Sequence, residues 1–133
     1  EIQFLDLKYF PNPWPEKSWE ENKSTSYIYG INVEGSRIVS FSIYQVSFDG
    51  KFAHLLKFLT IPTHRKLGHG QVLFDSDAKY LSEINVGSII LEVSSKNLQA
   101  QKFYKKQGFI SINHKNNFYA NGDDAIVLQK ALN

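Results

Sequence analysis

The sequence predicts an α/β (α+β) domain with a mixed, mostly antiparallel central β-sheet flanked by helices. Residues 27–60 hold three β-rich runs separated by turn residues, the pattern of an antiparallel meander. Within residues 71–107, two segments of helical periodicity flank one short apolar run. Two more β-rich runs follow at the end of the chain. Because a helix separates the third strand from the fourth, those two strands are expected to run parallel.

Length and composition restrict the class of protein. A chain of 133 residues with 42% apolar and 21% charged residues is expected to form a single domain over residues 1–133, with one core. The absence of cysteine excludes disulfides, thiol catalysis and Cys-type zinc sites. The net charge of +2 is spread along the chain with no basic block beyond Lys105-Lys106, so no nucleic-acid partner is expected.

The sequence also bears on location. No run is apolar and long enough to span a bilayer, and no signal-peptide pattern opens the chain. These features predict a soluble, cytoplasmic protein without a membrane partner. The lack of an initiator methionine indicates a processed or trimmed start.

The N-terminal region gives few signals. Residues 1–7 fit either a short strand or the start of a helix. The three prolines of segment 11–15 exclude a helix or a central strand there. A helix is expected from Glu16 to about Asn22. Trp14 and Trp19 are expected to pack on the core in preference to contacting a ligand.

The meander has clear boundaries. Strands are expected over residues 27–33 and 37–46, joined by a hairpin turn at Glu34-Gly35-Ser36. A second turn, residues 47–51, leads into a strand from Phe52 to about Thr60, which Pro62 ends.

The helix expected from Gln71 to Glu83 has one apolar face. Helical spacing places these residues on it: Leu73, Phe74, Ala78, Leu81 and Ile84. Asp77 falls within the same face, so its carboxylate is expected to be hydrogen-bonded.

The second half continues with a strand, a helix and two strands. Residues 88–93 are almost wholly apolar, which is typical of a strand covered on both faces. Residues 97–107 are expected to be helical, with Gly108 as the C-terminal cap. The last strands are expected over residues 109–114 and 125–132, joined by a polar loop.

The segment Arg65-Lys66-Leu67-Gly68-His69-Gly70 lies between a strand and a helix. Two glycines at a helix start allow the backbone to approach a ligand, and the free N–H groups there favour a phosphate or pyrophosphate. An ordinary turn whose glycines only relieve steric crowding explains the hexapeptide equally well.

Two residues are candidates for acid–base chemistry. Glu92 is the only ionisable group of its strand, and desolvation is expected to raise its pKa towards neutrality, as a general base requires. A structural Glu paired with Lys or Arg is the alternative. Tyr104 shares a helix face with Asn97 and Gln101, and its phenol is suited to protonate a thiolate or alkoxide; a core role is the alternative.

Other nucleophile and metal sites are not indicated. Ser94 and Ser95 are plausible turn residues, and no His and acid accompany them as in a serine triad. The four histidines lack paired metal-ligand spacing, so no metal site is expected.

Three segments together resemble the GNAT N-acetyltransferase superfamily. Its Arg/Gln-x-x-Gly-x-Gly/Ala signature is matched by Arg65, Gly68 and Gly70. The second half resembles the ribosomal-protein alanine N-acetyltransferase (RimI-type) branch. The matching segments are Leu91-Glu92-Val93, Asn97, Tyr104, Gly108-Phe109, Phe118-Tyr119 and Asp124-Ala125-Ile126.

The resemblance, which covers roughly residues 13–132, implies roles. It implies a parallel strand pair splayed around a site for acetyl-CoA, with Glu92 as the base and Tyr104 as the acid. Main-chain groups of Phe58, Leu59 and Thr60 would contact the pantetheine and the acetyl carbonyl. The pyrophosphate would be held by Lys66, Leu67, Gly68, His69, Gly70 and Gln71, after Arg65, and Asn97 would hydrogen-bond the cofactor.

The sequence departs from the family at three places. Thr60-Ile61-Pro62 stands where Val-Asp-Pro is usual. Trp14-Pro15-Glu16 departs slightly from a Pro-Trp-Ser pattern, of which Pro13-Trp14 keeps the first two residues. The region before Trp14 is too short for both a full first strand and the usual first helix, and that region helps to form the acceptor groove.

The leading hypothesis is direct transfer of an acetyl group from acetyl-CoA to a primary amine. The nearest acceptor is the N-terminal α-amine of a protein, such as a ribosomal protein. A small amine, either an aminoacyl compound or a polyamine, is the alternative acceptor. A non-catalytic acetyl-CoA-binding module is a different class, and it would need the loop but neither Glu92 nor Tyr104.

Overall fold

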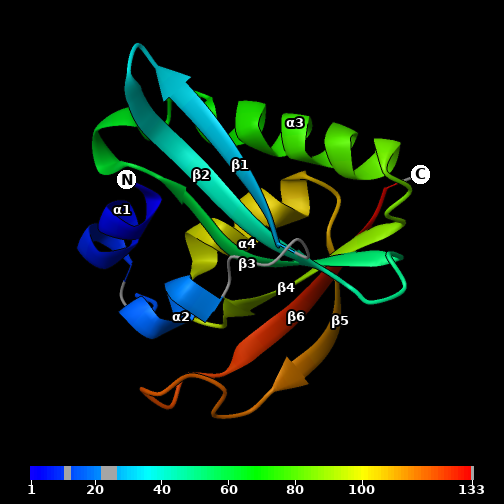
Figure 1. The fold of residues 1–133 in the computed structure, drawn as a ribbon. Helices are drawn as coiled ribbons and strands as arrows, with labels where there is room; N and C mark the ends of the chain where they lie inside the picture. Colours follow the sequence, from blue (N-terminus) through cyan, green and yellow to red (C-terminus); the bar gives the residue numbers. More distant parts are fainter. Residues whose placement is uncertain (11–12, 22–26, 133) are drawn as a thin grey trace.

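The computed structural model describes residues 1–10, 13–21 and 27–132, without the side chains of Glu20 and Glu21. A six-stranded sheet in the order β1-β2-β3-β4-β6-β5 forms its centre (Figure 1). The elements are α1 (Ile2–Tyr9), α2 (Glu16–Glu21), β1 (Tyr27–Glu34), β2 (Arg37–Val46), β3 (Phe52–Thr60), a 3-10 turn η1 (Pro62–His64), α3 (His69–Glu83), β4 (Ser88–Ser94), α4 (Leu98–Lys106), β5 (Ile110–Lys115) and β6 (Ala125–Ala131). Every pair of neighbouring strands is antiparallel except β3 and β4, which run parallel as expected.

Helices cover the sheet on both faces (Figure 1). On one face, α3 and α4 pack on a core that includes Phe74, Leu81 and Leu91. On the other, α1 and α2 pack on a second core that includes Leu5, Trp19 and Phe41. None of the helices within the described ranges is long and apolar enough to cross a bilayer.

A β-bulge in β3 exchanges the faces on which its side chains lie. Tyr44 of β2 pairs with Leu55, whereas the preceding Ile43 pairs with Lys57, so Leu56 is an extra residue in β3. Leu55 therefore belongs to the α3–α4 core, and Leu59 belongs to the α1–α2 core. The alternation of buried residues continues through the bulge, so the burial pattern alone does not reveal it.

The sheet opens at its centre, next to this bulge. Pairing between β3 and β4 extends only from Phe52↔Ser88 to His54↔Ile90. Beyond His54 the two strands part, and β4 remains fully paired with β6. The sheet therefore contains a gap bordered by the C-terminal halves of two parallel strands.

Several predictions about α3 can be compared with the structure. The buried Asp77 accepts hydrogen bonds from Ser42 Oγ (2.6 Å) and Tyr44 OH (3.0 Å), which confirms the expected partner. Burial raises the Asp77 pKa to about 6, against the two hydrogen bonds, which lower it. Placing Ile84 on the apolar face was wrong, because it follows the last helical residue and is 41% exposed.

The expected element boundaries are close to those observed. The α3 helix begins at His69, two residues before the expected start, and the last helix begins at Leu98 with Asn97 as its N-cap. Gly108 has φ +97° just after that helix, as a C-terminal glycine requires. The N-terminal residues form a helix, α1, and not a strand.

A buried ion pair attaches the N-terminal region to the sheet. Lys57 Nζ lies 2.7 Å from Asp6 Oδ1, and both side chains are at most 4% exposed. The backbone N–H of Trp14 donates to Asp6 Oδ2 at 2.7 Å. The Lys57 ammonium also lies over the rings of Phe10 (4.3 Å) and Trp14 (5.1 Å). Lys57 therefore joins α1, Trp14 and β3.

The two tryptophans pack together, with ring centroids 4.8 Å apart. Trp19 is buried in the α1–α2 core, as expected. Trp14 packs only partly on that core and also borders the central pocket described below. The expected end of this helix at about Asn22 lies outside the described residues.

Candidate active site

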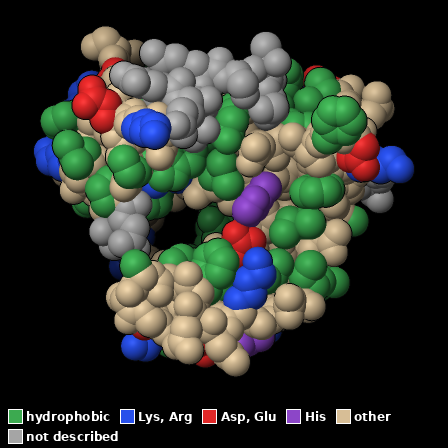
Figure 2. All heavy atoms as spheres, turned by 60° about the horizontal axis from the view of Figure 1, so that its bottom comes forward, with side chains coloured by type: hydrophobic (Ala, Val, Ile, Leu, Met, Phe, Trp, Pro, Cys, Tyr) green, Lys and Arg blue, Asp and Glu red, His purple; other side chains and the backbone are tan. Residues whose placement is uncertain are grey.

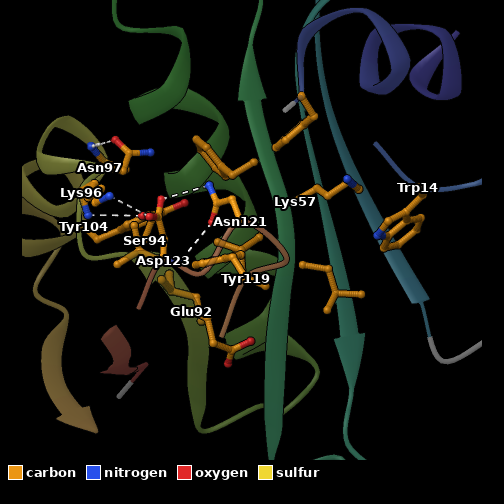
Figure 3. A pocket seen from close by; sticks show the side chains of 17 residues that line it. Trp14, Lys57, Glu92, Ser94, Lys96, Asn97, Tyr104, Tyr119, Asn121 and Asp123 are labelled. Carbon is orange, nitrogen blue, oxygen red and sulfur yellow. Dashed lines mark hydrogen bonds and ion pairs between the residues drawn. The ribbon is translucent and has the colours of Figure 1, made fainter. Parts of the chain in front are cut away.

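A pocket of about 700 Å³ occupies the gap between β3 and β4. Its walls are formed by Phe10, Trp14, Leu55, Leu56, Lys57, Phe58, Leu91, Glu92, Val93, Ser94, Lys96, Asn97, Ala100, Tyr104, Tyr119, Asn121 and Asp123. Figure 2 shows a deep opening in the surface, with one histidine and one acidic side chain at its rim. Figure 3 shows Trp14 and Lys57 on one side of β3 and Tyr104 on the other. Side chains from both faces of the sheet therefore line the pocket.

Glu92 is positioned by a histidine from the neighbouring strand. Its Oε1 lies 2.8 Å from His54 Nε2, across the last residues at which β3 and β4 pair. The Glu92 side chain is 15% exposed and that of His54 is 34% exposed. The two residues form an acid–imidazole pair at the narrow end of the gap.

The expected direction of the Glu92 pKa shift was wrong. The hydrogen bond from His54 holds the pKa of Glu92 below its ordinary value, although desolvation raises it. The charges of His54 and Lys115 also lower this pKa. Glu92 is therefore ionised at neutral pH, and its partner is a histidine instead of the Lys or Arg considered from the sequence.

Tyr104 lies on the opposite side of the sheet. Its ring packs edge-on against Phe58, Phe103 and Phe109. Burial raises the pKa of the Tyr104 phenol well above its ordinary value. The hydroxyl therefore keeps its proton at neutral pH, so it can donate that proton or a hydrogen bond.

The gap brings Glu92 and Tyr104 to one pocket from opposite faces. Glu92 shares the α1–α2 face with His54, whereas Tyr104 belongs to α4 and packs with the α3–α4 core. Tyr119, from the loop between β5 and β6, also borders the pocket, and its pKa is raised by burial and by the charge of Glu92. A continuous sheet would separate these groups.

The loop before α3 has the geometry of an anion site. Gly68 has φ +86° and Lys66 has φ +63°, both in the left-handed region. In the described part of the chain, the backbone N–H groups from Lys66 to Gln71 find no protein acceptor. The side chain of Arg65 donates from Nε to the Thr60 carbonyl at 2.9 Å, which ties the loop to the end of β3. Consecutive free N–H groups at a helix start favour a phosphate.

The side chains of this loop make local contacts. The 68%-exposed Leu67 extends into solvent. His69 Nδ1 lies 3.1 Å from Asn32 Nδ2, and Gln71 exchanges hydrogen bonds with Gln107, the C-cap of α4. A Cβ on Gly70 would lie 3.6 Å from the Phe58 ring and from Thr60 Oγ1, so the loop adjoins the end of β3 that borders the pocket.

The remaining candidates occupy different positions. Phe58 borders the pocket, whereas the side chain of Leu59 is buried in the α1–α2 core and does not reach it. Because β3 has no partner on the β4 side beyond His54, main-chain groups of residues 56–60 on that side border the gap. The side chain of Asn97 accepts the Ala100 N–H at 3.1 Å as the N-cap of α4, and Asn97 also borders the pocket.

The sequence did not indicate a role for His54, the partner of Glu92, or for Tyr119, which lines the pocket. His54 lies beside Glu92 because β3 and β4 pair in the register that sets His54 opposite Ile90, two residues before Glu92. This register cannot be read from the sequence. Tyr119 lies in an irregular loop, where no periodicity indicates which side chains turn inward. Within residues 1–10, 13–21 and 27–132, no group of three His, Cys, Asp or Glu residues is arranged to hold a metal ion.

Comparison with known proteins gives consistent similarities. Residues 1–109 match the model of the acetyltransferase (GNAT) family. An N-alpha-acetyltransferase of Sulfurisphaera tokodaii is 31% identical over 62% of this chain, which spans only half of that relative's length. A [ribosomal protein bS18]-alanine N-acetyltransferase of Haemophilus ducreyi is 27% identical over 80% of this chain and 72% of its own. The crystal structure of the ribosomal-protein-S18-alanine N-acetyltransferase from Escherichia coli superposes with a TM-score of 0.89 at 25% identity, covering 98% of this chain and 85% of the other.

Proposed function

The chain belongs to the GNAT acetyltransferase family, and from that premise we propose that it transfers the acetyl group of acetyl-CoA to a primary amine, preferentially the N-terminal α-amine of a protein. Enzymes of this family use acetyl-CoA. The S. tokodaii relative is named an N-alpha-acetyltransferase, and the H. ducreyi relative is named a ribosomal-protein-alanine N-acetyltransferase. Both names support a protein N-terminus as the acceptor.

Features of the chain fit acetyl-CoA. The free N–H groups from Lys66 to Gln71 would hold the pyrophosphate, with Gly68 providing the left-handed backbone conformation of the loop. Main-chain groups of Phe58, Leu59 and Thr60 would contact the pantetheine and the acetyl carbonyl, where β3 lacks a partner on the β4 side. We assign Asn97 a hydrogen bond to the cofactor, because it borders the pocket at the start of α4.

The chemistry requires the acceptor nitrogen to lose two protons, one before and one after its attack, and the leaving sulfur to gain one. When bound, acetyl-CoA supplies a thioester carbonyl that an unprotonated amine can attack. Glu92, ionised and held by His54, would accept the proton of the acceptor ammonium through water. Tyr104 would donate its hydroxyl proton to the leaving sulfur as the carbon–sulfur bond breaks, and the second proton lost by the attacking nitrogen would restore the phenol. Because the chain has no cysteine, no thiol of the protein can carry the acetyl group in between.

The observation that carries this proposal is the gap in the sheet. It lets a carboxylate from one face and a phenol from the other border a single pocket. The acceptor would therefore approach from the α1–α2 face and acetyl-CoA from the α3–α4 face, so that the amine and the thioester meet between β3 and β4. Positioning of two substrates in one pocket is itself a large contribution to rate.

The alternatives are an N-acetyltransferase of a small amine and a non-catalytic acetyl-CoA-binding module. Thiol release from acetyl-CoA, measured with a panel of N-terminal peptides and small amines, separates them. We expect turnover with peptides, and Glu92→Gln and Tyr104→Phe should each lower turnover by roughly 10²- to 10⁴-fold. Acetyl-CoA affinity, measured by calorimetry, should change little.

Matched controls are Glu83→Gln and Tyr80→Phe, because both residues are exposed on α3 and away from the pocket. These two variants should keep the parent rate. Tight acetyl-CoA binding by the parent with no transfer to any amine would identify a binding module. An unchanged rate for Tyr104→Phe at saturating acetyl-CoA would remove Tyr104 as the acid.

A further inference from the structure

A lysine at the end of β5, Lys115, lies on the Glu92 face of the sheet and forms no ion pair within the described residues. Lys115, the last residue of β5, pairs with Ala125 of β6, which in turn pairs with Ser94 of β4. Directly opposite residues of antiparallel strands point to the same face, and Ser94 is two residues from Glu92. Lys115 therefore lies on the same face of the sheet as Glu92.

The influence of Lys115 on Glu92 agrees with this placement. Its charge is one of the causes that lower the Glu92 pKa. A substrate amine that approaches Glu92 therefore also approaches Lys115.

Lys115 has no carboxylate partner in the described part of the chain. Its ammonium lies 5.1 Å from the centre of the exposed Phe118 ring. The two carboxylates of the nearby loop are engaged elsewhere, Asp123 with Lys96 (2.9 Å) and Asp124 with His114 (3.0 Å). Lys115 is thus available to an anion from outside the protein.

We propose, on the basis of the function proposed above, that Lys115 selects acceptors that carry a carboxylate close to the reacting amine. An acceptor ammonium next to Glu92 is repelled by Lys115, and a carboxylate in the acceptor cancels that repulsion. Polyamines and peptides with basic residues next to the amine are correspondingly poor acceptors.

The spacing indicates where the carboxylate belongs. Lys115 is two strands away from Glu92, about 10 Å in the direction across the sheet. An extended acceptor advances about 3.3 Å per residue, so a side chain on its second or third residue reaches the Lys115 ammonium. A small amino compound that carries its own carboxylate is the other acceptor that could present this negative charge to Lys115.

The test compares acceptors within each protein variant. Amidated peptides that begin with alanine and carry acidic, neutral or basic second and third residues are assayed by thiol release, together with free alanine and alaninamide. The measured quantity is the kcat/KM of the acidic peptide divided by that of the basic peptide. A substitution that changes Glu92 or acetyl-CoA binding alters both values equally, so its effect cancels in this ratio. We expect the parent to prefer the acidic peptide by roughly 3- to 10-fold, as for an exposed charge pair, and less at high salt.

Three variants test the assignment. In Lys115→Gln the ratio should fall towards one, and in Lys115→Glu it should invert. Lys79→Glu, an equivalent charge change at an exposed position of α3, should keep the parent ratio. Melting temperatures of all variants establish that they are folded.

The outcomes separate this inference from the function on which it rests. Equal ratios in the parent and in all variants, with substantial turnover, overturn the role of Lys115 and leave the acetyltransferase proposal standing. No turnover with any peptide or amine overturns the proposed function itself. A preference for free alanine over alaninamide that Lys115→Gln abolishes supports the inference and identifies a small carboxylated amine as the source.

Discussion

At the scale of single residues, the protonation state of Glu92 depends on its neighbour in β3. Burial alone raises the pKa of a carboxyl group, and from the sequence this was the expected effect. In the structure, His54 Nε2 is 2.8 Å away and the hydrogen bond dominates, so the Glu92 pKa is lowered. Near neutral pH the rate should therefore follow the ionisation of the acceptor amine and not that of Glu92.

The variant His54→Leu tests this assignment. The substitution removes the hydrogen bond, which is the largest cause of the lowered Glu92 pKa. Desolvation, which raises the pKa, remains, so the pKa of Glu92 should rise. Since a carboxyl group can accept a proton only when it is ionised, the acidic limb of the kcat/KM profile should move to higher pH if Glu92 is the base. His54→Gln keeps a neutral hydrogen-bond donor and should move the limb less. An acidic limb at the same pH in all three proteins would show that the limb does not report Glu92.

At the scale of elements, the loop between η1 and α3 depends on its backbone. Gly68, the N-cap of α3, has φ +86°, which an L-residue adopts only with strain. Gly70 has an ordinary conformation, and a Cβ there would make only van der Waals contacts at 3.6–3.7 Å. The two glycines of the same motif therefore have different physical roles.

Alanine substitutions should separate these roles. Gly68→Ala strains or rearranges the loop by about 1–2 kcal/mol, which should weaken acetyl-CoA binding by roughly tenfold. The new Cβ of Gly70→Ala is directed towards Phe58 and Phe103 and away from the free N–H groups, so its binding should stay within a few-fold of the parent. Calorimetric titration with acetyl-CoA measures both. Equal losses would mean that backbone conformation is not what Gly68 contributes.

Most elements could be predicted from the sequence because local patterns specify them. The turns at residues 34–36 and 47–51 and the helical period of residues 71–83 define the meander and the crossover. The N-terminal helix was ambiguous, because residues 1–7 are too few to show a period. The bulge at Leu56 was not predictable, because burial alternates through it as in a regular strand.

At the scale of the whole molecule, a buried ion pair joins the N-terminal region to the sheet in addition to the apolar contacts of α1. Asp6 of α1 and Lys57 of β3 are 51 positions apart in the chain and meet at 2.7 Å. Lys57 follows the bulge directly, so the residue that attaches α1 also borders the pocket. The position of α1, and with it the wall formed by Phe10 and Trp14, depends on this pair.

Lys57→Met should therefore destabilise the protein strongly. It leaves the Asp6 carboxylate buried with only the Trp14 N–H as a partner, at a cost of about 3–5 kcal/mol. Adding Asp6→Asn removes the buried charge and keeps an acceptor for that N–H, so the double variant should recover most of the loss. Urea unfolding gives the free energies. A loss below about 1 kcal/mol in the single variant would mean that the pair is solvated.

The site was predictable only in part. Glu92 and Tyr104 could be identified because each is unusual in its own element, a lone carboxylate in an apolar strand and a phenol on a helix face. Their meeting in one pocket could not be deduced from local patterns, because it depends on where β3 and β4 stop pairing. His54, Tyr119 and Lys115 acquire their places from strand register and loop conformation, which single-sequence patterns do not specify.

The gap in the sheet has a consequence for how such a protein can diversify. The described residues form two cores, one under α3 and α4 next to the loop proposed to bind the pyrophosphate and one under α1 and α2 next to the side proposed for the acceptor. Beyond His54 no ladder hydrogen bonds cross from β3 to β4. Substitutions in α1, in α2 or in the loop before β6 can thus reshape the acceptor side while the half that would hold acetyl-CoA keeps its packing. One reaction can in this way be redirected to new amines by changes confined to one side of the molecule.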